Sequence, residues 1–369
     1  LPNLLGYLLT GIILGPFVFN VIDTTTFQIS SDIRQIALMI ILMHAGLNLQ
    51  ISDLKKVGSS ALLMCFVPAS FEILGLMILA PIFLHLDLLN AAILGTVLAA
   101  VSPAVVVPLM LRLMDEGYGT KEGIPQLIMA GASMDDVYVI VLFTSLLTLA
   151  KSGEFNALSL LRIPTSILFG IVSGIVLGYV LCKLYRLLKL PTGIELASMF
   201  AIGMVLITIE RIMTGMIGFS GLLAIMALTA TIRHIKPEMA DKYSAVLAKL
   251  WQPAEIFLFA LVGASVRIDY ALSFGPVVLV VIILALVFRI LGVYLSIMKT
   301  KFNMKERIFT MGAYLPKATV QAAIGGLALE AGLASGELIL TAAVTAILFT
   351  APLGAIFISL TYRNFLQKV

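Results

Sequence analysis

Residues 131–147 have the sequence GASMDDVYVIVLFTSLL, in which two adjacent aspartates lead an otherwise apolar run. A run of this kind is typical of a membrane-spanning helix. One aspartate at the centre of a bilayer costs about 2.5–3.5 kcal/mol on translocon scales, so a pair costs about 5–7 kcal/mol before the two charges repel each other. We therefore expect Asp135 and Asp136 to have a function that justifies this cost.

The composition of the whole chain is that of a polytopic membrane protein. Of its 369 residues 60% are hydrophobic and only 12% are charged, which is too little polar surface for a soluble domain of this size. Sustained apolar runs indicate helices, and the alternating pattern of an outer-membrane barrel is absent. The net charge of +4 is weak evidence for a nucleic-acid partner, and we expect none. The sequence predicts an all-α polytopic membrane protein.

Apolar runs separated by charged or Gly/Pro turns predict about twelve transmembrane helices. They fall near residues 4–19, 33–50, 57–84, 88–113, 123–150, 160–186, 193–211, 218–232, 253–266, 272–298, 305–330 and 337–361. Because the chain starts at Leu1 in an apolar run, we expect one further helix before it, thirteen in the full-length protein.

The distribution of Lys and Arg predicts the orientation. Most of these residues fall in loops on one side of the twelve-helix topology, and Lys and Arg accumulate in cytoplasmic loops. The C-terminus is then cytoplasmic. The segment KPEMADKYSAVLAKLWQ, residues 236–252, is amphipathic and too charged to span. We interpret it as a linker helix on the cytoplasmic surface.

Two of the predicted helices contain proline in mid-span. Pro103 and Pro108 lie in the helix at 88–113, and Pro316 lies in the helix at 305–330. Each proline frees a backbone carbonyl one turn upstream. Either one alone could be a simple kink, but transporters use pairs of broken helices to place freed carbonyls and helix ends at an ion site.

Two further charges lie far from the ends of their helices. Glu72 and Arg289 could form a buried ion pair, which either couples to ion movement or only holds helices together. Glu72 precedes the first broken helix and the aspartate pair, and Arg289 precedes the second broken helix and a last helix. The two triplets start on opposite sides of the membrane in our topology, which indicates inverted repeats with the site at their interface.

The aspartate pair suits the exchange of protons for small cations. Adjacent carboxylates repel, so one of them tends to hold a proton. The same hard oxygens bind hard cations such as Na⁺ or Li⁺. A site that holds either a proton or a metal cation is the simplest device for exchanging the two.

Five segments of the chain together resemble the monovalent cation:proton antiporters, and most of all their NHA-type sodium/proton branch, which has bacterial members. The segments are LPNLLGYLLTGIILGP (1–16), HAGLNL (44–49), VSPAVVVP (101–108), GASMDDV (131–137) and YLPKATVQAAIGG (314–326). The resemblance covers essentially the whole chain, and the Asp-Asp and LPKATVQAA motifs in this order are its most specific part.

The resemblance implies an architecture. Residues 57–150 and 272–361 would form a mobile ion-transporting core that contains two crossing broken helices. Residues 1–50 and 160–266 would form a dimerisation scaffold, and the protein would be a homodimer. Transport would proceed by elevator-type movement of the core, in a bacterial inner membrane, without a cofactor and without catalysis.

The resemblance also implies roles for single residues. Asp135 and Asp136 would bind the Na⁺ or Li⁺ and the proton, with Asp136 as the principal ligand. Backbone oxygens around Val101, Ser102 and Ala132 would complete the site. The branch's ion pair falls on Glu72 and Arg289, Lys317 would offset helix-end charge in the second broken helix, and Pro103 and Pro316 mark the breaks. Electrogenic relatives have a lysine at the position of Arg289, so an electrogenic stoichiometry is in doubt here.

Other functions fit the sequence less well. A channel needs a continuous pore, and nothing resembles a carbonyl filter. An intramembrane aspartyl protease needs carboxylates on separate helices, whereas neighbours on one helix point about 100° apart. A K⁺/H⁺ exchanger, or a sodium-coupled organic anion symporter of similar fold, stays open as an alternative.

Overall fold

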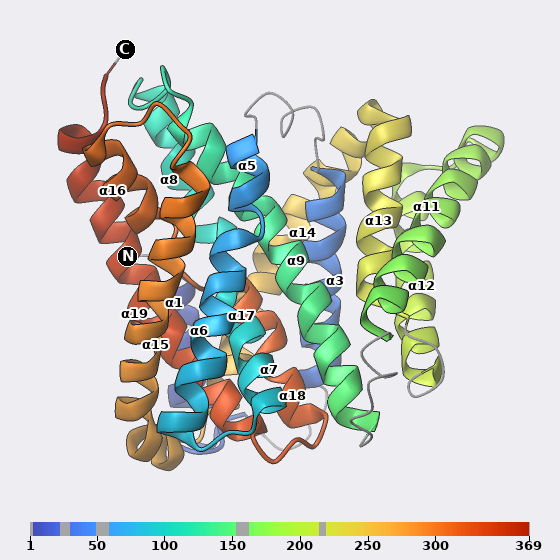
Figure 1. Cartoon of the computed structure of the whole chain (residues 1–369). Coiled ribbons are helices and arrows are strands. Elements are labelled where there is room, and N and C mark those ends of the chain that lie inside the picture. The colour runs from blue at the N-terminus through green and yellow to red at the C-terminus, as the bar shows by residue number, and fades with distance from the viewer. Residues whose placement is uncertain (1–2, 23–29, 49–58, 153–161, 214–218, 369) are drawn as a thin grey trace. The chain divides into compact units, whose positions relative to one another are not determined.

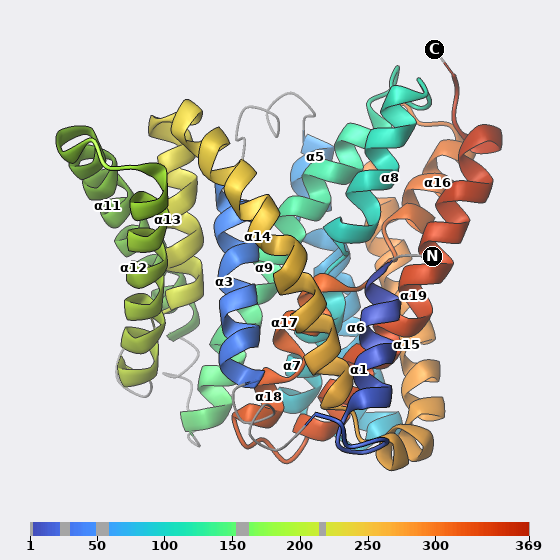
Figure 2. The same cartoon turned by 180° about the vertical axis from the view of Figure 1, so that it is seen from behind.

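The structure is a computed structural model of the chain, and it describes residues 3–22, 30–48, 59–152, 162–213 and 219–368. These residues form helices and loops, with one isolated β-bridge between Tyr118 and Lys368 (Figures 1 and 2). The prediction of an all-α polytopic architecture is confirmed.

Within the described residues, eight helical stretches are long and apolar enough to cross a membrane, and those at 59–84 and 88–115 are each interrupted once. They comprise Ser59–Leu84, Leu88–Asp115, Ile124–Lys151, Leu168–Leu188, Thr192–Glu210, Pro237–Ala264, Ile268–Ile297 and Gly336–Phe365. Shorter apolar helices cover Asn3–Leu14, Gln35–Leu47 and Gly221–Ile235. The figure of about twelve spans therefore stays a prediction.

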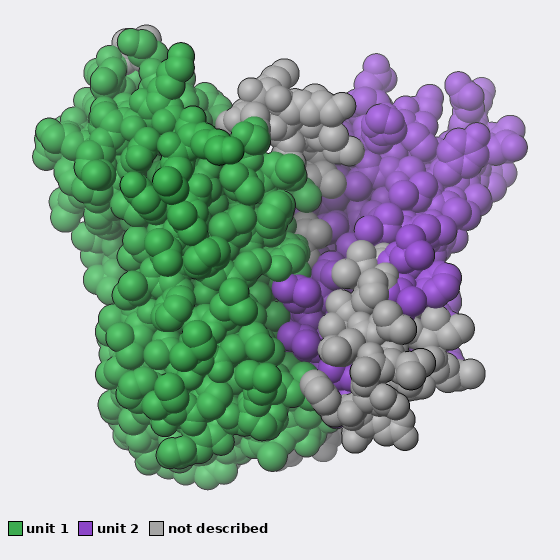
Figure 3. Space-filling view, viewed as in Figure 1, with its two compact units in different colours: residues 1–28, 51–140, 259–369 green, residues 29–50, 141–258 purple. Residues whose placement is uncertain are grey.

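The chain divides into two compact units (Figure 3). Unit 1 contains residues 1–28, 51–140 and 259–369, and unit 2 contains residues 29–50 and 141–258. The helices wholly inside unit 1 are α1 (Asn3–Leu14), α5 (Ser59–Met64), α6 (Val67–Leu84), α7 (Leu88–Ala99), α8 (Pro103–Asp115), α15 (Ile268–Ile297), α16 (Met304–Ala313), α17 (Thr319–Ile324), α18 (Leu327–Glu330) and α19 (Gly336–Phe365). Those wholly inside unit 2 are α3 (Ser30–Leu47), α11 (Arg162–Leu188), α12 (Thr192–Met213) and α13 (Gly221–Ile235). The division falls within α9 (Ile124–Ser152) and α14 (Pro237–Ala264).

The first broken helix consists of α7 and α8. Asp87 caps the start of α7, and its side chain accepts the backbone N–H groups of Leu89 and Asn90. It ends at Ala99, and the chain is extended at Ala100 and Ser102 before α8 begins at Pro103. A residue before proline avoids the helical conformation, and proline itself suits the first position of a helix, so the sequence places the break at this point.

The second broken helix consists of α16, α17 and α18. Asn303 and Glu306 form a reciprocal capping box at the start of α16. The chain leaves the helix after Ala313 and resumes at Thr319, with Pro316 in the gap. The two breaks meet, because the N–H of Ser102 donates to the carbonyl of Pro316 at 2.8 Å. The predicted pair of crossing broken helices, at 88–113 and 305–330, is confirmed.

Helices α6 and α15 pack face to face in unit 1 and carry Glu72 and Arg289. Glycine allows the close approach: a Cβ on Gly75 would lie 2.6 Å from the ring of Phe288, and one on Gly292 would lie 2.7 Å from Cα of Pro68. A helix, a broken helix and a further helix follow one another twice in chain order, as α6, α7–α8 and α9 and again as α15, α16–α18 and α19. The inverted relation of the two sets stays a prediction.

Two boundaries differ from the predicted ones. The segment 236–252 is not a separate helix, because α14 continues through Pro253 to Ala264; a proline removes one hydrogen bond of a long helix without ending it. Residues 1–28 belong to unit 1 rather than with the scaffold segments. Helix α1 lies against the end of α14, where a Cβ on Gly11 would lie 1.9 Å from the carbonyl oxygen of Ala260.

Unit 2 is held together by glycine contacts between α11 and α13. Gly170, Gly174 and Gly178 follow one another at one-turn spacing on α11. A Cβ at each would lie between 2.3 and 2.8 Å from a backbone oxygen of Ser220, Ala224 or Leu228. Small residues at this spacing let two membrane helices approach closely.

Candidate functional site

The two aspartates lie on α9 in unit 1. Asp135 is fully buried and Asp136 is 9% exposed. Because residues of a helix are about 100° apart around its axis, neighbouring side chains meet different surroundings. The two carboxylates therefore have different partners.

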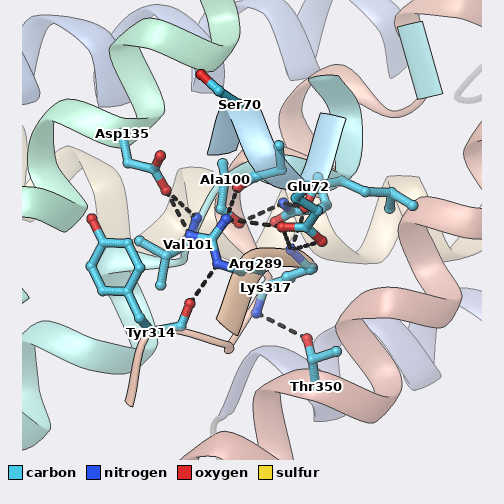
Figure 4. Close-up of polar contacts among 12 residues, drawn as sticks. Ser70, Glu72, Ala100, Val101, Asp135, Arg289, Tyr314, Lys317 and Thr350 are labelled. Carbon is cyan, nitrogen blue, oxygen red and sulfur yellow. Dashed lines mark hydrogen bonds and ion pairs between the residues drawn. The ribbon is translucent and has the colours of Figure 1, made fainter. Parts of the chain in front are cut away.

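Asp135 is bound at one of its oxygens by two donors. Its Oδ2 accepts the backbone N–H of Val101, in the break of the first broken helix, at 2.9 Å. The same oxygen accepts Nη2 of Arg289 at 2.9 Å (Figure 4). The other oxygen, Oδ1, is buried and has no hydrogen-bond partner within the described residues.

Arg289 joins several parts of the site. It is fully buried on α15, and its Nη1 donates to Oε2 of Glu72 at 2.9 Å and to the carbonyl of Ala99. Its Nε donates to the carbonyl of Tyr314, in the second break, at 2.7 Å, and its guanidinium lies 5.1 Å from the centre of the Tyr314 ring. A guanidinium can do this because its donors form a fixed planar fork.

Lys317 is also fully buried and forms an ion pair with Glu72. Its Nζ lies 2.7 Å from Oε1 and 2.9 Å from Oε2 of that carboxylate, and it also donates to the carbonyl of Leu98. Its backbone N–H donates to Oγ1 of Thr350 on α19 at 3.0 Å (Figure 4). Glu72 therefore lies between two cations.

Asp136 differs from this network. Its Oδ1 is buried and has no hydrogen-bond partner in the part of the chain that the structure describes. Among the other predicted ligands, the carbonyl of Ser102 accepts the N–H groups of Val105 and Val106 at the start of α8. Ala132 lies inside α9, one turn before Asp136.

The charges of the network balance around Asp136. Arg289 and Lys317 are two cations, and Glu72 and Asp135 are two anions, all within ion-pair distance of a partner. Breaking a buried ion pair costs about 3–5 kcal/mol, because one charge is left without compensation. The arrangement leaves one acid, Asp136, for which the network supplies no contacting cation. Within the described residues, no three His, Cys, Asp or Glu side chains gather as a site for a tightly held metal.

The sequence pointed to the charged residues of this site but missed several of their contacts. The contact between Arg289 and Asp135 was not expected. Lys317 was predicted to offset helix-end charge; it donates to the carbonyl of Leu98 near the end of α7 and also pairs with Glu72, which was not expected.

Two further contacts were missed: the carbonyl of Tyr314 accepts Arg289, and Nε2 of Gln321 donates to the carbonyl of Ala100. Gln321 is a polar residue in a stretch of mostly small and apolar residues, which was the available signal.

The family model of the transmembrane sodium/hydrogen exchangers matches residues 1–363. The chain belongs to the sodium/hydrogen exchanger family. It is similar to sodium/hydrogen exchanger 9B2 of Homo sapiens, with 35% identity over 383 residues that cover all of this chain and 70% of that protein. Sodium/hydrogen exchanger 9B1 of Homo sapiens is also 35% identical, and 73% of its length is covered.

A solved structure has the same fold. The sodium proton antiporter MjNhaP1 from Methanocaldococcus jannaschii superposes with a TM-score of 0.84 over 99% of this chain and 92% of that chain, at 20% identity. The membrane-spanning helices and the family membership make the chain an integral membrane protein that exchanges cations for protons, and its family is one of transporters rather than enzymes. The resemblance to cation:proton antiporters that was noted in the sequence is confirmed.

Proposed function

We propose that the protein exchanges Na⁺ or Li⁺ for protons at Asp136 and Asp135, with the cation and the proton in competition. The observation that carries the proposal is that Oδ1 of each aspartate is buried without a hydrogen-bond partner among the described residues, while Asp135 contacts the break between α7 and α8 through the N–H of Val101. Bare oxygens of this kind are ligands for a hard cation and acceptors for a proton. Backbone oxygens near Val101 would complete the coordination.

The charge balance favours a one-for-one exchange. With Arg289 and Lys317 charged and Glu72 and Asp135 ionised, the four groups sum to zero. Asp136 is then neutral with one proton, and the site is again neutral when Asp136 is ionised beside one monovalent cation. A loaded site without net charge avoids the cost of carrying charge through the bilayer. We therefore expect electroneutral exchange.

Alternating access would follow from movement of the ion-carrying core. The core at 57–150 and 272–361 would carry both broken helices across the membrane in an elevator-type motion. The scaffold, predicted at residues 1–50 and 160–266 and here without residues 1–28, would form the contact of a homodimer. The clustering of Lys and Arg supports a cytoplasmic C-terminus, and a bacterial inner membrane remains our proposed location.

The test is exchange in proteoliposomes that contain only this protein. Na⁺ or Li⁺ should dissipate an imposed proton gradient, and Asp136→Asn should abolish the effect. Asp269→Asn is the matched control, because Asp269 is an exposed aspartate of the same unit that pairs with Arg267. Wild-type exchange by Asp136→Asn would overturn the site assignment.

A panel of cations separates the remaining functions. Activity with K⁺ alone would identify a K⁺/H⁺ exchanger, and flux that needs an organic anion would identify a symporter. Clamping the membrane potential tests the stoichiometry. A rate that depends on the potential would contradict electroneutral exchange.

A further inference from the structure

One peptide group in the break between α7 and α8 is hydrogen-bonded to a side chain through its N–H and to another side chain through its carbonyl. The carbonyl of Ala100 and the N–H of Val101 belong to the same peptide, and a peptide group is planar and rigid. Its N–H donates to Oδ2 of Asp135 at 2.9 Å. Its carbonyl accepts Nε2 of Gln321, from α17 in the second broken helix, at 3.0 Å. The orientation of this one plane is thus fixed from both sides.

Gln321 is a poor choice for stability alone. It is fully buried, and its Nε2 also approaches the carbonyl of Leu98, at 3.4 Å. Its Oε1, however, has no hydrogen-bond partner within the described residues. A buried oxygen without a donor costs at least as much as one neutral hydrogen bond returns, so an apolar side chain of the same shape would be about as stable. A group of this kind calls for an explanation other than stability.

Gln321 is one of three side chains that donate to the carbonyls at the end of α7. A helix leaves its last carbonyls without intrahelical donors. The carbonyl of Leu98 receives Lys317, that of Ala99 receives Arg289, and that of Ala100 receives Gln321. The first two donors are charged and contact Glu72 as well. Gln321 alone of these three is neutral, so it orients a peptide without altering the charge balance of the site.

We propose that Gln321 is a positioning residue for cation exchange. It holds the Ala100–Val101 peptide so that the N–H faces Asp135 and the carbonyl faces away from that carboxylate. Without this bond the peptide can rotate, Asp135 loses an aligned donor, and the aspartate pair is less well prepared for the cation. This inference rests on the proposed function, since it assigns to Gln321 an effect on the same site.

The experiment compares Gln321→Met with wild type in proteoliposomes. Methionine matches the length of glutamine and lacks both the donor and the unmatched acceptor. We expect the apparent KM for Na⁺ to rise about fivefold to tenfold, as for the loss of one hydrogen bond. The maximal rate should stay within about twofold of wild type and the melting temperature close to it, since the substitution leaves the fold intact. A purely structural role would change stability and expression and leave KM unchanged.

The control is Gln126→Met. Gln126 lies in the first turn of α9 in the same unit, about 15 Å along the helix from Asp136. Its Oε1 is also buried and has no partner among the residues that the structure describes. This variant should have the wild-type KM. A wild-type KM in Gln321→Met would overturn the proposal, and so would an equal rise of KM in the control.

A second variant keeps the test decisive if Gln321→Met does not fold. Gln321→Leu is apolar, has a similar volume and removes the donor, so its KM should also rise. Na⁺ binding can be measured independently as the Na⁺-dependent rise in melting temperature. A wild-type response of Gln321→Leu in both measurements would overturn the proposal. If wild-type protein itself exchanges no Na⁺, the proposed function fails; if it exchanges Na⁺ and both variants match it, only this inference fails.

Discussion

Units 1 and 2 each bury a carboxylate, and they hold it in different ways. In unit 1, Asp135 faces Arg289, and one of its oxygens has no partner within the described residues. In unit 2, Oε2 of Glu195 accepts the hydroxyl of Tyr243 at 2.7 Å, and the backbone carbonyl of Glu195 accepts the hydroxyl of Tyr185 at 2.9 Å. The first carboxylate has a charged partner, and the second has a neutral donor.

The position of Glu195 explains how its buried carboxylate can be accommodated with a neutral hydrogen-bond donor and no cation. It lies in the first turn of α12, where the free N–H groups of the helix favour negative charge. Its interactions are local and join α11, α12 and α14 of unit 2. The network of unit 1 instead joins both broken helices through charged side chains, and within the described residues it leaves one oxygen of Asp135 without a partner. In the function proposed above, the contact in unit 2 would stabilise the fold, and the network of unit 1 would take part in transport.

The largest expected effect is that of removing Arg289. Arg289→Met leaves Glu72 with one cation and Asp135 with none, so we expect a loss of about 3–5 kcal/mol in the free energy of unfolding. Exchange should be lost as well. The stability and exchange rate of Arg289→Lys should lie between those of wild type and Arg289→Met, because a single ammonium cannot reach both carboxylates as the guanidinium fork does. Denaturation in detergent and exchange in proteoliposomes measure both effects.

Reversing both charges is the informative control. Glu72→Arg with Arg289→Glu would place a new cation beside Lys317 and a new anion beside Asp135. A simple two-residue pair would recover from this exchange, but the four-residue network should not. Wild-type stability of the double variant would show that only the Glu72–Arg289 contact matters.

The sequence predicted those parts of the fold that depend on local chemistry. Proline lacks the backbone N–H of a helical hydrogen bond, and Pro103 and Pro316 both lie at breaks, although Pro108 lies inside the continuous helix α8. The pairing of Glu72 with Arg289 could be inferred because buried charges in a membrane are few and need partners. By contrast, Pro253 leaves α14 continuous, since neighbouring turns of a long helix outweigh one lost hydrogen bond.

The rest of the site depends on tertiary geometry. A guanidinium fork can serve two carboxylates, but only the packing of α6, α9 and α15 brings Asp135 to the second branch of Arg289. Likewise, Gln321 reaches Asp135 through a peptide of another helix, and no spacing along the chain encodes this contact. Glutamine in an apolar run was a visible signal, but its partner was not.

A smaller effect is expected when the neutral donor of unit 2 is removed. Tyr243→Phe takes one hydrogen bond from a buried carboxylate, which costs about 1.5–3 kcal/mol for a charged acceptor. The apparent KM for Na⁺ should not change, because the contact belongs to the scaffold. Thermal denaturation and exchange kinetics measured on one preparation check both statements. A raised KM together with unchanged stability would contradict the distinction between the two units.

The smallest effect is expected at a carboxylate on the surface of unit 1. Glu116, just after α8, accepts Nε of Arg112 at 2.7 Å and the hydroxyl of Tyr362 at 2.8 Å. The hydrogen bond from Arg112 lowers the pKa of Glu116 below its usual value, and the bond from Tyr362 adds to this. A carboxylate whose pKa is lower in the folded state stabilises the protein above its unfolded pKa of about 4.3.

That contribution is lost as the pH falls through the folded pKa of Glu116. Glu116→Gln should therefore melt slightly below wild type at neutral pH, and the difference should shrink as the solution is acidified below about pH 4. The effect is small because solvent screens an exposed pair. Melting temperatures of both proteins across this range test it. A difference that grows on acidification would mean that Glu116 is held in its protonated form, as a carboxylate in an apolar site would be, and the contrast between surface and buried acids in unit 1 would have to be redrawn.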